Sequence, residues 1–365
     1  MKKYLLLKIQ LIGCVLITIT FSSCKKDKTS AVVNATPATI GLYEYASGSD
    51  KRLLIPITKI GTLTKIGTQA MNYGCIFDTG SPGMTMDATD ILPASMITST
   101  GITVTGDSTV VSGITVTSKT STISFGDATG TTTEYGNLAY ANITVGNSLG
   151  SLELKRVPFF LYYKIKDSKG NVYPAHSADV FGVGTGTSST NTSISSPLRS
   201  YSYGTGLTSG FKLATLSSTS FLGTPTYVSN LLTIGLTSAD LSSAGFIMHP
   251  LLPKYSYNPY IEGTLTYNNK TIDAVFLFDT GTPSVSTIED KLAVAAVSLP
   301  TNTTVTLKTN QGFIYTYVTT STGNLTQVAN PNTTGDYRSI FSLDFFIKNE
   351  YLTNYSSRVV GLKNN

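Results

Sequence analysis

The sequence predicts an all-β protein built from two similar lobes. Thr, Val, Ile and Tyr occur in short apolar or alternating runs that Gly and Asn interrupt. This composition is typical of many short strands joined by turns. Two segments about 200 residues apart also share a motif, an apolar strand followed by Asp-Thr-Gly and a hydroxyl residue, which indicates a duplicated unit. We therefore expect mostly antiparallel strands with a few short helices.

The chain begins with the features of a targeting signal. A Lys-Lys pair follows the first residue, residues 4–20 are largely apolar, and a Phe-Ser-Ser run precedes Cys24. This order resembles the bacterial lipobox, with Phe where Leu is more common. The resemblance implies that residues 1–23 are a lipoprotein signal peptide and that Cys24 carries the lipid. An uncleaved transmembrane helix is the alternative, although the apolar run is short for a span.

These features predict a protein held at a membrane by lipid and not by a spanning helix. Residues 24–45 are expected to be a tether, and the basic residues after Cys24 would lie beside anionic lipid heads. The body from Thr29 onward has 20 basic and 20 acidic residues, so its charge gives no reason to expect nucleic acid as a partner. We expect a monomer of the bacterial cell envelope that faces the periplasm or the cell surface.

Cysteine and histidine are too few for a disulfide framework or a metal site. With Cys24 lipidated, Cys75 is the one cysteine of the body, and its apolar surroundings predict a buried filler and not a nucleophile. The histidines, His176 and His249, are expected at surface or loop positions, and with one Cys they do not suffice for a zinc site of the usual ligand types. We expect no metal and no cofactor, because the G-x-G pairs do not form a dinucleotide-binding fingerprint.

The strand-rich segments fall into two regions. Residues 46–185 are expected to form the N-terminal lobe, and residues 216–365 the C-terminal lobe. Between them, residues 186–215 are polar, aperiodic and rich in Gly, Ser and Thr, as expected of an interlobe linker. The best helix candidates are residues 288–298 and the segment SLDFFIKNEY that begins at Ser342.

The repeated motif carries the residues best suited to chemistry. A carboxylate at the end of an apolar strand is costly unless backbone N–H groups and a nearby hydroxyl support it. One such Asp could be an ordinary turn residue. Two, Asp78 and Asp279, occur with matching apolar lead-ins, hydroxyl residues and following prolines. Their matching contexts indicate a pair that meets at the interface of two lobes.

A pair of carboxyl groups at hydrogen-bonding distance cannot ionise twice at low cost, so the two groups share one proton. The charged member can act as a general base on a water, and the protonated member can donate to the carbonyl under attack. The titration then belongs to the pair, and the sequence assigns neither Asp a pKa of its own.

With these residues, the sequence resembles the pepsin-type aspartic proteases, as a bacterial lipoprotein member of that family. Three further segments carry the likeness. The run Ile123-Ser124-Phe125-Gly126-Asp127 resembles the family's flap hairpin. The DVFGVG run that begins at Asp179 resembles the segment that crosses behind the first Asp loop, and IFSLDFFIKNEY with the terminal VVGL resembles its counterpart in the second lobe. The likeness spans Leu53 to Leu362 in the expected order.

The resemblance implies the two-lobed pepsin-like fold and a role for each matching residue. Asp78 and Asp279 would be the catalytic dyad of an aspartic endopeptidase that binds a peptide or protein substrate. The residues after them would brace the two loops (Thr79, Thr280), turn the chain (Gly80, Gly281) and bond the outer carboxylate oxygens (Ser81, Thr282). The tip of the flap, which closes over a peptide and excludes water, would consist of Phe125, Gly126 and Asp127.

The chain departs from the family pattern at two positions. Phe125 stands where the flap carries Tyr, and the sequence has no Trp for such a Tyr to bond, so a looser flap is expected. Ser342 stands where the second crossing segment has Gly, which predicts poorer packing behind Asp279. These departures leave open a pepsin-fold envelope lipoprotein that binds peptides with weak or no cleavage. A third interpretation, a β-rich module that binds glycan or acts as an adhesin, treats both Asp-Thr-Gly segments as ordinary turns.

Overall fold

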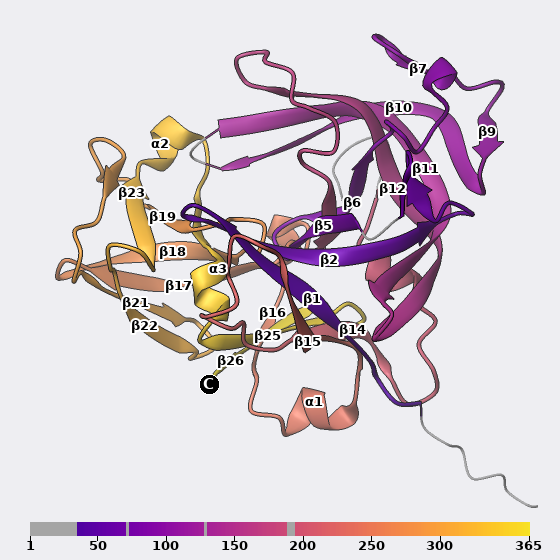
Figure 1. Cartoon of the computed structure of the whole chain (residues 1–365). Helices are drawn as coiled ribbons and strands as arrows, with labels where there is room; N and C mark the ends of the chain where they lie inside the picture. Colours follow the sequence, from indigo (N-terminus) through magenta and orange to yellow (C-terminus); the bar gives the residue numbers. More distant parts are fainter. Residues whose placement is uncertain (1–34, 71–72, 128–129, 188–193) are drawn as a thin grey trace, which may run out of the picture. The chain divides into compact units, whose positions relative to one another are not determined.

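The computed structural model describes residues 35–70, 73–127, 130–187 and 194–365 (Figure 1). Strands dominate this part of the chain and its helices are short, so the expected all-β class is confirmed. The predicted signal peptide and the lipid site at Cys24 lie outside the described residues. None of the helices described is long and apolar enough to cross a membrane.

The N-terminal lobe is built on one part of a 14-stranded sheet. Its strands are β2 (Asp50–Ile60), β5 (Tyr73–Asp78), β6 (Pro82–Asp87), β9 (Ser108–Val111), β10 (Ile114–Asp127), β11 (Gly130–Asn147), β12 (Gly150–Asp167) and β13 (Val180–Val183). Smaller elements lie beside them: β3 (Lys65–Ile66), β4 (Gln69–Ala70), η1 (Ala94–Met96), β7 (Ile97–Thr98), β8 (Gly101–Ile102) and η2 (Pro197–Ser200). Cys75 is fully buried and unpaired in the core of this lobe, as predicted.

The same sheet continues into a platform whose strands come from distant parts of the chain. They are β1 (Ala38–Ser47), β14 (Thr208–Leu213), β15 (Thr226–Leu236), β16 (Ile247–Pro250), β25 (Asn349–Asn354) and β26 (Val359–Asn364), with α1 (Ser238–Ser242) and η3 (Pro253–Tyr255) in the connections. In the order of the sheet β1 lies next to β15, followed by β14 and then β25, and Figure 1 shows these strands together in the lower part of the view. The platform therefore joins the start, the middle and the end of the body.

Two predicted boundaries are wrong because of this platform. The predicted tether, residues 24–45, includes most of β1, and the predicted linker, residues 186–215, includes all of β14. In each strand only two large aliphatic or aromatic side chains are nearly or fully buried, Ile40 and Leu42 in β1 and Phe211 and Leu213 in β14. Such short apolar signals are lost among the surrounding Ser, Thr and Gly.

The C-terminal lobe has its own 8-stranded sheet. Its strands are β17 (Tyr260–Tyr267), β18 (Lys270–Phe278), β19 (Val285–Glu289), β20 (Val297–Ser298), β21 (Thr304–Thr309), β22 (Ile314–Val318), β23 (Leu325–Ala329) and β24 (Arg338–Phe341), and its helices are α2 (Pro331–Thr334) and α3 (Leu343–Phe346). The helix predicted at Ser342 is confirmed as the single turn α3, followed by β25.

The helix predicted over residues 288–298 is wrong. The segment begins as the end of β19, continues through turns and ends in β20. β19 pairs in parallel with β23, and the apolar side chains of Leu292 and Val294 are exposed, so no apolar helix face is buried here. Sheet pairing overrides the local helix propensity of the Ala-rich sequence.

The two lobes repeat one arrangement around the motif strands. β13 pairs in parallel with β5 and antiparallel with β6, which brings Gly182 level with Asp78. In the second lobe β24 pairs in parallel with β18 and antiparallel with β19. In each lobe the Asp-Thr-Gly turn thus joins two strands, and a third strand from later in the chain lies between them. The two predicted crossing segments form these third strands, β13 and β24.

Candidate active site

The two Asp-Thr-Gly turns bring Asp78 and Asp279 together. The two carboxyl groups lie close enough for the charge of Asp78 to raise the pKa of Asp279. A Cβ atom added at Gly80 would lie 2.6 Å from Cγ of Asp279, and one added at Gly281 would lie 2.8 Å from Cγ of Asp78. Each glycine therefore faces the carboxyl group of the other lobe, and a larger residue at either position would displace that group.

Thr79 and Thr280 hold the two turns against each other. The backbone N–H of Thr79 donates to Oγ1 of Thr280 at 3.0 Å, and the backbone N–H of Thr280 donates to Oγ1 of Thr79 at 3.1 Å. The Thr79 hydroxyl donates to the carbonyl of Phe278 at 2.8 Å, and the Thr280 hydroxyl donates to that of Phe77 at 2.6 Å. Both threonines are fully buried, where such bonds are strong. The structure thus forms the brace that the resemblance implies.

The two carboxyl groups receive different numbers of donors. Oδ1 of Asp78 accepts the backbone N–H groups of Gly80 at 2.7 Å and Ser81 at 3.0 Å, and its Oδ2 accepts the Ser81 hydroxyl at 2.5 Å. Asp279 accepts the N–H of Gly281 and the hydroxyl of Thr282, both at 2.8 Å. Because donors stabilise the charged form, this difference favours the negative charge on Asp78.

Electrostatics favour the proton on Asp279. Although the residue keeps some exposed surface, its carboxyl group is enclosed, and this burial raises the pKa of Asp279 well above its ordinary range. The charge of Asp78 and the hydrogen bond between the two groups raise that pKa further, while the donors from Thr282 and Gly281 oppose the rise. The pair can therefore share one proton, which the burial of Asp279 and its smaller number of donors favour on Asp279. This arrangement can supply a general base and a general acid side by side.

A cleft of about 590 Å³ opens over the pair. The β10–β11 hairpin lines one side of it with Phe125 and Gly126, and the hairpin closes at the pair Asp127–Gly130. Phe125 packs against a small buried cluster that includes Phe160 and Tyr162. Residues 128–129 and the side chain of Asp127 lie outside the described part of the chain.

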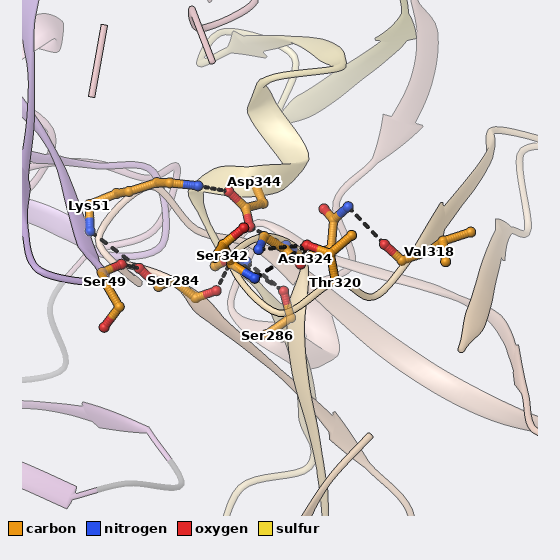
Figure 2. Close-up of polar contacts among 11 residues, drawn as sticks. Ser49, Lys51, Ser284, Ser286, Val318, Thr320, Asn324, Ser342 and Asp344 are labelled. Carbon is orange, nitrogen blue, oxygen red and sulfur yellow. Dashed lines mark hydrogen bonds and ion pairs between the residues drawn. The ribbon is translucent and has the colours of Figure 1, made fainter. Parts of the chain in front are cut away.

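Ser342 fits its position through hydrogen bonds, as Figure 2 shows. It is fully buried, its backbone N–H donates to Oγ of Ser286 at 3.1 Å, and its hydroxyl donates to the carbonyl of Ser284 at 3.2 Å. The matching residue of the first lobe, Gly182, has no such room, since a Cβ there would lie 2.5 Å from the carbonyl oxygen of Gly83. The expectation of poorer packing behind Asp279 is therefore wrong.

The tip of the β1–β2 hairpin contacts the same part of the second lobe. Lys51 forms an ion pair with Asp344 of α3, its backbone N–H donates to Oγ of Ser284 at 3.2 Å, and the Ser284 hydroxyl donates to the carbonyl of Ser49 (Figure 2). No pattern in the sequence pointed to this contact, because a Lys in a polar turn is normally solvated.

Two arginines that sequence reasoning missed also line the cleft, Arg52 on β2 and Arg338 at the start of β24. Tyr260, at the start of β17, lines it as well. Arg338 forms two bonds to Asp336, at 2.8 and 2.5 Å, and a third to the Tyr260 hydroxyl at 3.0 Å. Its position directly before the second crossing segment was the one available signal for Arg338.

The histidines differ from the expectation. His249 is buried on β16, its ring contacts the Thr309 hydroxyl, and burial lowers its pKa to about 4. His176 lies in a loop as expected but is partly buried and paired with Asp179. Neither lines the cleft. Within the described ranges, no group of three or more His, Cys, Asp or Glu residues is placed to hold a metal ion.

Comparisons with solved structures identify the fold. No family model and no curated protein matches this sequence. An aspartic proteinase from Irpex lacteus is similar in structure, with a TM-score of 0.55 and 16% identity over 90% of this chain and 98% of that one. Basic 7S globulin from soybean is similar too, with a TM-score of 0.54 and 11% identity over 90% and 96% of the two chains. The chain has the bilobal pepsin-like fold that the sequence predicted, and at these identities the likeness shows the fold alone.

Proposed function

We propose that this protein is an aspartic endopeptidase that hydrolyses peptide bonds with a water activated between Asp78 and Asp279. The observation that carries the proposal is the carboxyl pair itself, held close together by the two facing turns and lining a cleft large enough for part of a peptide. The support around the pair, from the threonine brace to the two facing glycines, holds both groups in place before any substrate binds.

The difference in hydrogen-bond donors between Asp78 and Asp279 assigns the roles of base and acid. Asp78 accepts a proton from the water as the water attacks the carbonyl carbon, and Asp279 gives its proton to the carbonyl oxygen. The tetrahedral intermediate then collapses as Asp78 passes its proton to the leaving nitrogen and Asp279 takes one back from the intermediate. The pair ends the cycle with the single proton it began with.

The hairpin and the lobes would bind the substrate as an extended chain. The edge of β10 near Phe125 and Gly126, which β9 does not reach, lines the cleft and can pair with a peptide backbone as strands do. Closure of this hairpin would exclude bulk water from the carboxyl pair and so strengthen its electrostatic effect.

A mutation of the dyad tests the proposal. Full-chain protein would be assayed against a mixed peptide library from acid to neutral pH. Asp279→Asn removes the transferable proton, so cleavage should fall by about 10³-fold or more. The matched control is Asp273→Asn, which changes an exposed carboxylate on the same strand, β18, and should leave cleavage unchanged. Cleavage that survives Asp279→Asn would refute the dyad.

The second candidate function is peptide binding without cleavage. It is favoured by the similarity of the fold to a seed globulin as well as to a proteinase, because a fold does not determine activity. Tight binding of a statine-type transition-state mimic by a wild-type protein that cleaves nothing would support this candidate over the endopeptidase.

The proposed location of the protein in the cell rests on its sequence alone. The lipobox-like segment supports a monomer anchored by lipid at Cys24 in the bacterial cell envelope, where it would meet peptide or protein substrates. Labelling of cells with a fatty acid should mark the wild-type protein and not the Cys24→Ala variant, and equal labelling of both would exclude this anchor.

A further inference from the structure

The cleft contains a positive charge without an acidic partner. Arg52 lines it together with Asp78 and Asp279. Its one hydrogen bond among the described residues runs from Nη1 to the carbonyl of Lys51, at 3.4 Å, and no described carboxylate lies within ion-pair distance of it. Burial lowers the pKa of Arg52, and the nearby carboxyl groups of Asp50 and Asp279 oppose that shift. A guanidinium nevertheless stays charged at any working pH.

Strand register explains why Arg52 faces the carboxyl pair. β2 and β5 are antiparallel, with Leu54 opposite Ile76. The same register extended by two residues brings Arg52 level with Asp78. Residues directly opposite each other on antiparallel strands project from the same face of the sheet. Arg52 and Asp78 therefore point into the cleft from neighbouring strands.

The backbone beside Arg52 is held in place from the other side. Successive side chains on a strand point to opposite faces, so Lys51 points away from the cleft while Arg52 points into it. The Lys51 side chain pairs with Asp344, and its backbone N–H donates to Ser284 (Figure 2). Arg52 is thus presented from a segment that the second lobe already fixes, which lowers the entropy lost when a ligand binds.

Arg338, the other arginine that lines the cleft, already has a carboxylate partner. Two hydrogen bonds to Asp336 neutralise Arg338, and a third joins it to Tyr260. The remaining charged residues of the lining are Asp78 and Asp279 themselves. Arg52 is therefore the charged group of the lining that remains available to a ligand.

We propose that Arg52 binds a carboxylate of the peptide in the cleft, so that this protein selects acidic peptides. The proposal rests on the proposed function in one respect, that the cleft is a peptide site. A guanidinium offers two parallel N–H groups that match the two oxygens of a carboxylate. That carboxylate belongs either to an Asp or Glu side chain or to the C-terminus of the peptide, and the chemistry of recognition is the same.

The test measures binding, so that it does not depend on turnover. Full-chain protein is titrated by calorimetry with statine-containing peptides that differ only by Glu or Gln at each position in turn. A second series has a free or an amidated C-terminus. We expect the carboxylate form to bind about tenfold more tightly than its neutral match at one position, the effect of a charge-assisted bond in a partly exposed cleft.

Two variants assign the preference to Arg52. Arg52→Gln should remove it, and Arg52→Glu should reverse it in favour of Lys at the same position. The control is Arg156→Gln, which changes an exposed arginine of β12 outside the cleft and should keep the preference. A preference at a side-chain position identifies an internal acidic residue, and one confined to the free C-terminus identifies the terminal carboxylate.

The outcomes separate this proposal from the endopeptidase itself. Equal affinity for charged and neutral peptides, a preference that survives Arg52→Gln, or no binding of any peptide would overturn the role of Arg52. Cleavage of peptides without any such preference would leave the endopeptidase standing. A clear preference in a protein that cleaves nothing would support the role of Arg52 and refute the endopeptidase.

Discussion

The two lobes present the same Asp-Thr-Gly turn but support it differently from behind. In the first lobe the crossing strand packs behind the turn through the backbone of Gly182, because a Cβ there would lie 2.5 Å from the carbonyl oxygen of Gly83. In the second lobe Ser342 takes the matching place and fills it with hydrogen bonds to Ser284 and Ser286. The geometry of the turn is thus compatible with two kinds of support, as long as the space behind it is filled and its polar groups are bonded.

The turns themselves differ by one bond. The backbone N–H of Ser81 donates to the carboxylate of Asp78 at 3.0 Å, whereas that of Thr282 turns to the backbone carbonyl of Asp279 at 3.3 Å. With one donor fewer, Asp279 gains less stabilisation of its charged form, which adds to the effect of burial in favouring the proton on this side. Duplicated loops therefore need not produce equal carboxyl groups, and a small local difference separates the base from the acid.

The strongest test of the shared turn changes its glycines. Gly80→Ala and Gly281→Ala should each lower activity by about 100-fold or more, because the new Cβ would lie 2.6 or 2.8 Å from Cγ of the facing Asp and displace it. Both effects should appear in kcat with the fold retained, as circular dichroism would show. A similar loss from both sides is expected if the lobes contribute equally to the geometry.

A glycine outside the site provides the control. A Cβ at Gly101 would have no heavy atom within 4 Å, so Gly101→Ala should leave activity unchanged. If Gly80→Ala remains as active as this control, the two carboxyl groups are farther apart than the structure places them.

The next test exchanges the residues behind the turns. Gly182→Ser should reduce the free energy of unfolding by about 3 kcal/mol, the upper end of the cost of overpacking. Ser342→Gly should reduce it by about 1 kcal/mol, through lost hydrogen bonds and added chain entropy. Urea unfolding of both variants measures the difference. If both substitutions reduce the free energy of unfolding equally, the residues behind the two turns support them in the same way.

The sequence predicted the centre of the site and little of its surroundings. Asp78 and Asp279 could be predicted because an Asp at the end of an apolar strand needs local donors, and those donors follow directly in the chain. Arg52 could not, because its place depends on the register of β2 against β5, which no local pattern reveals. Ser342 was expected to pack poorly because the second crossing segment of the family has Gly there, and the sequence did not show that Ser284 and Ser286 lie where they can bond it.

The strands, too, were predicted where the local sequence carries a signal and missed where it does not. Strands with continuous apolar runs, such as those that lead to each Asp, were recognised. β1 and β14 were assigned to a tether and a linker because their few buried apolar side chains lie among Ser, Thr and Gly, and because one neighbour of each strand, β15 for β1 and β25 for β14, is distant in the chain. A strand that depends in part on such a distant neighbour carries little signal of its own.

The lobes also differ in how the start of the crossing strand is held. In the second lobe the permanently charged Arg338 bonds Asp336. In the first, Nε2 of His176 lies 2.8 Å from the carbonyl of Thr89, which can only accept, so Nε2 carries a proton. Nδ1 of the same ring lies 2.8 Å from Oδ2 of Asp179. A doubly protonated ring donates to both, which makes the support of this lobe depend on pH.

This difference predicts the smallest effect, a change of stability with pH. Burial lowers the pKa of His176, but the hydrogen bond and charge of Asp179, the carbonyl of Thr89 and the charge of Asp87 outweigh it, so that the pKa is raised above 6.5. A raised histidine pKa stabilises the fold fully below about 6.5, and that contribution is lost as pH rises through the folded pKa. His176→Gln should therefore cost up to about 1 kcal/mol at pH 5.5 and less at pH 9 in urea unfolding. Arg338→Gln, whose guanidinium does not titrate, should cost the same at both. A cost for His176→Gln that does not change between these pH values would mean that the ring is neutral and that the two supports behave alike.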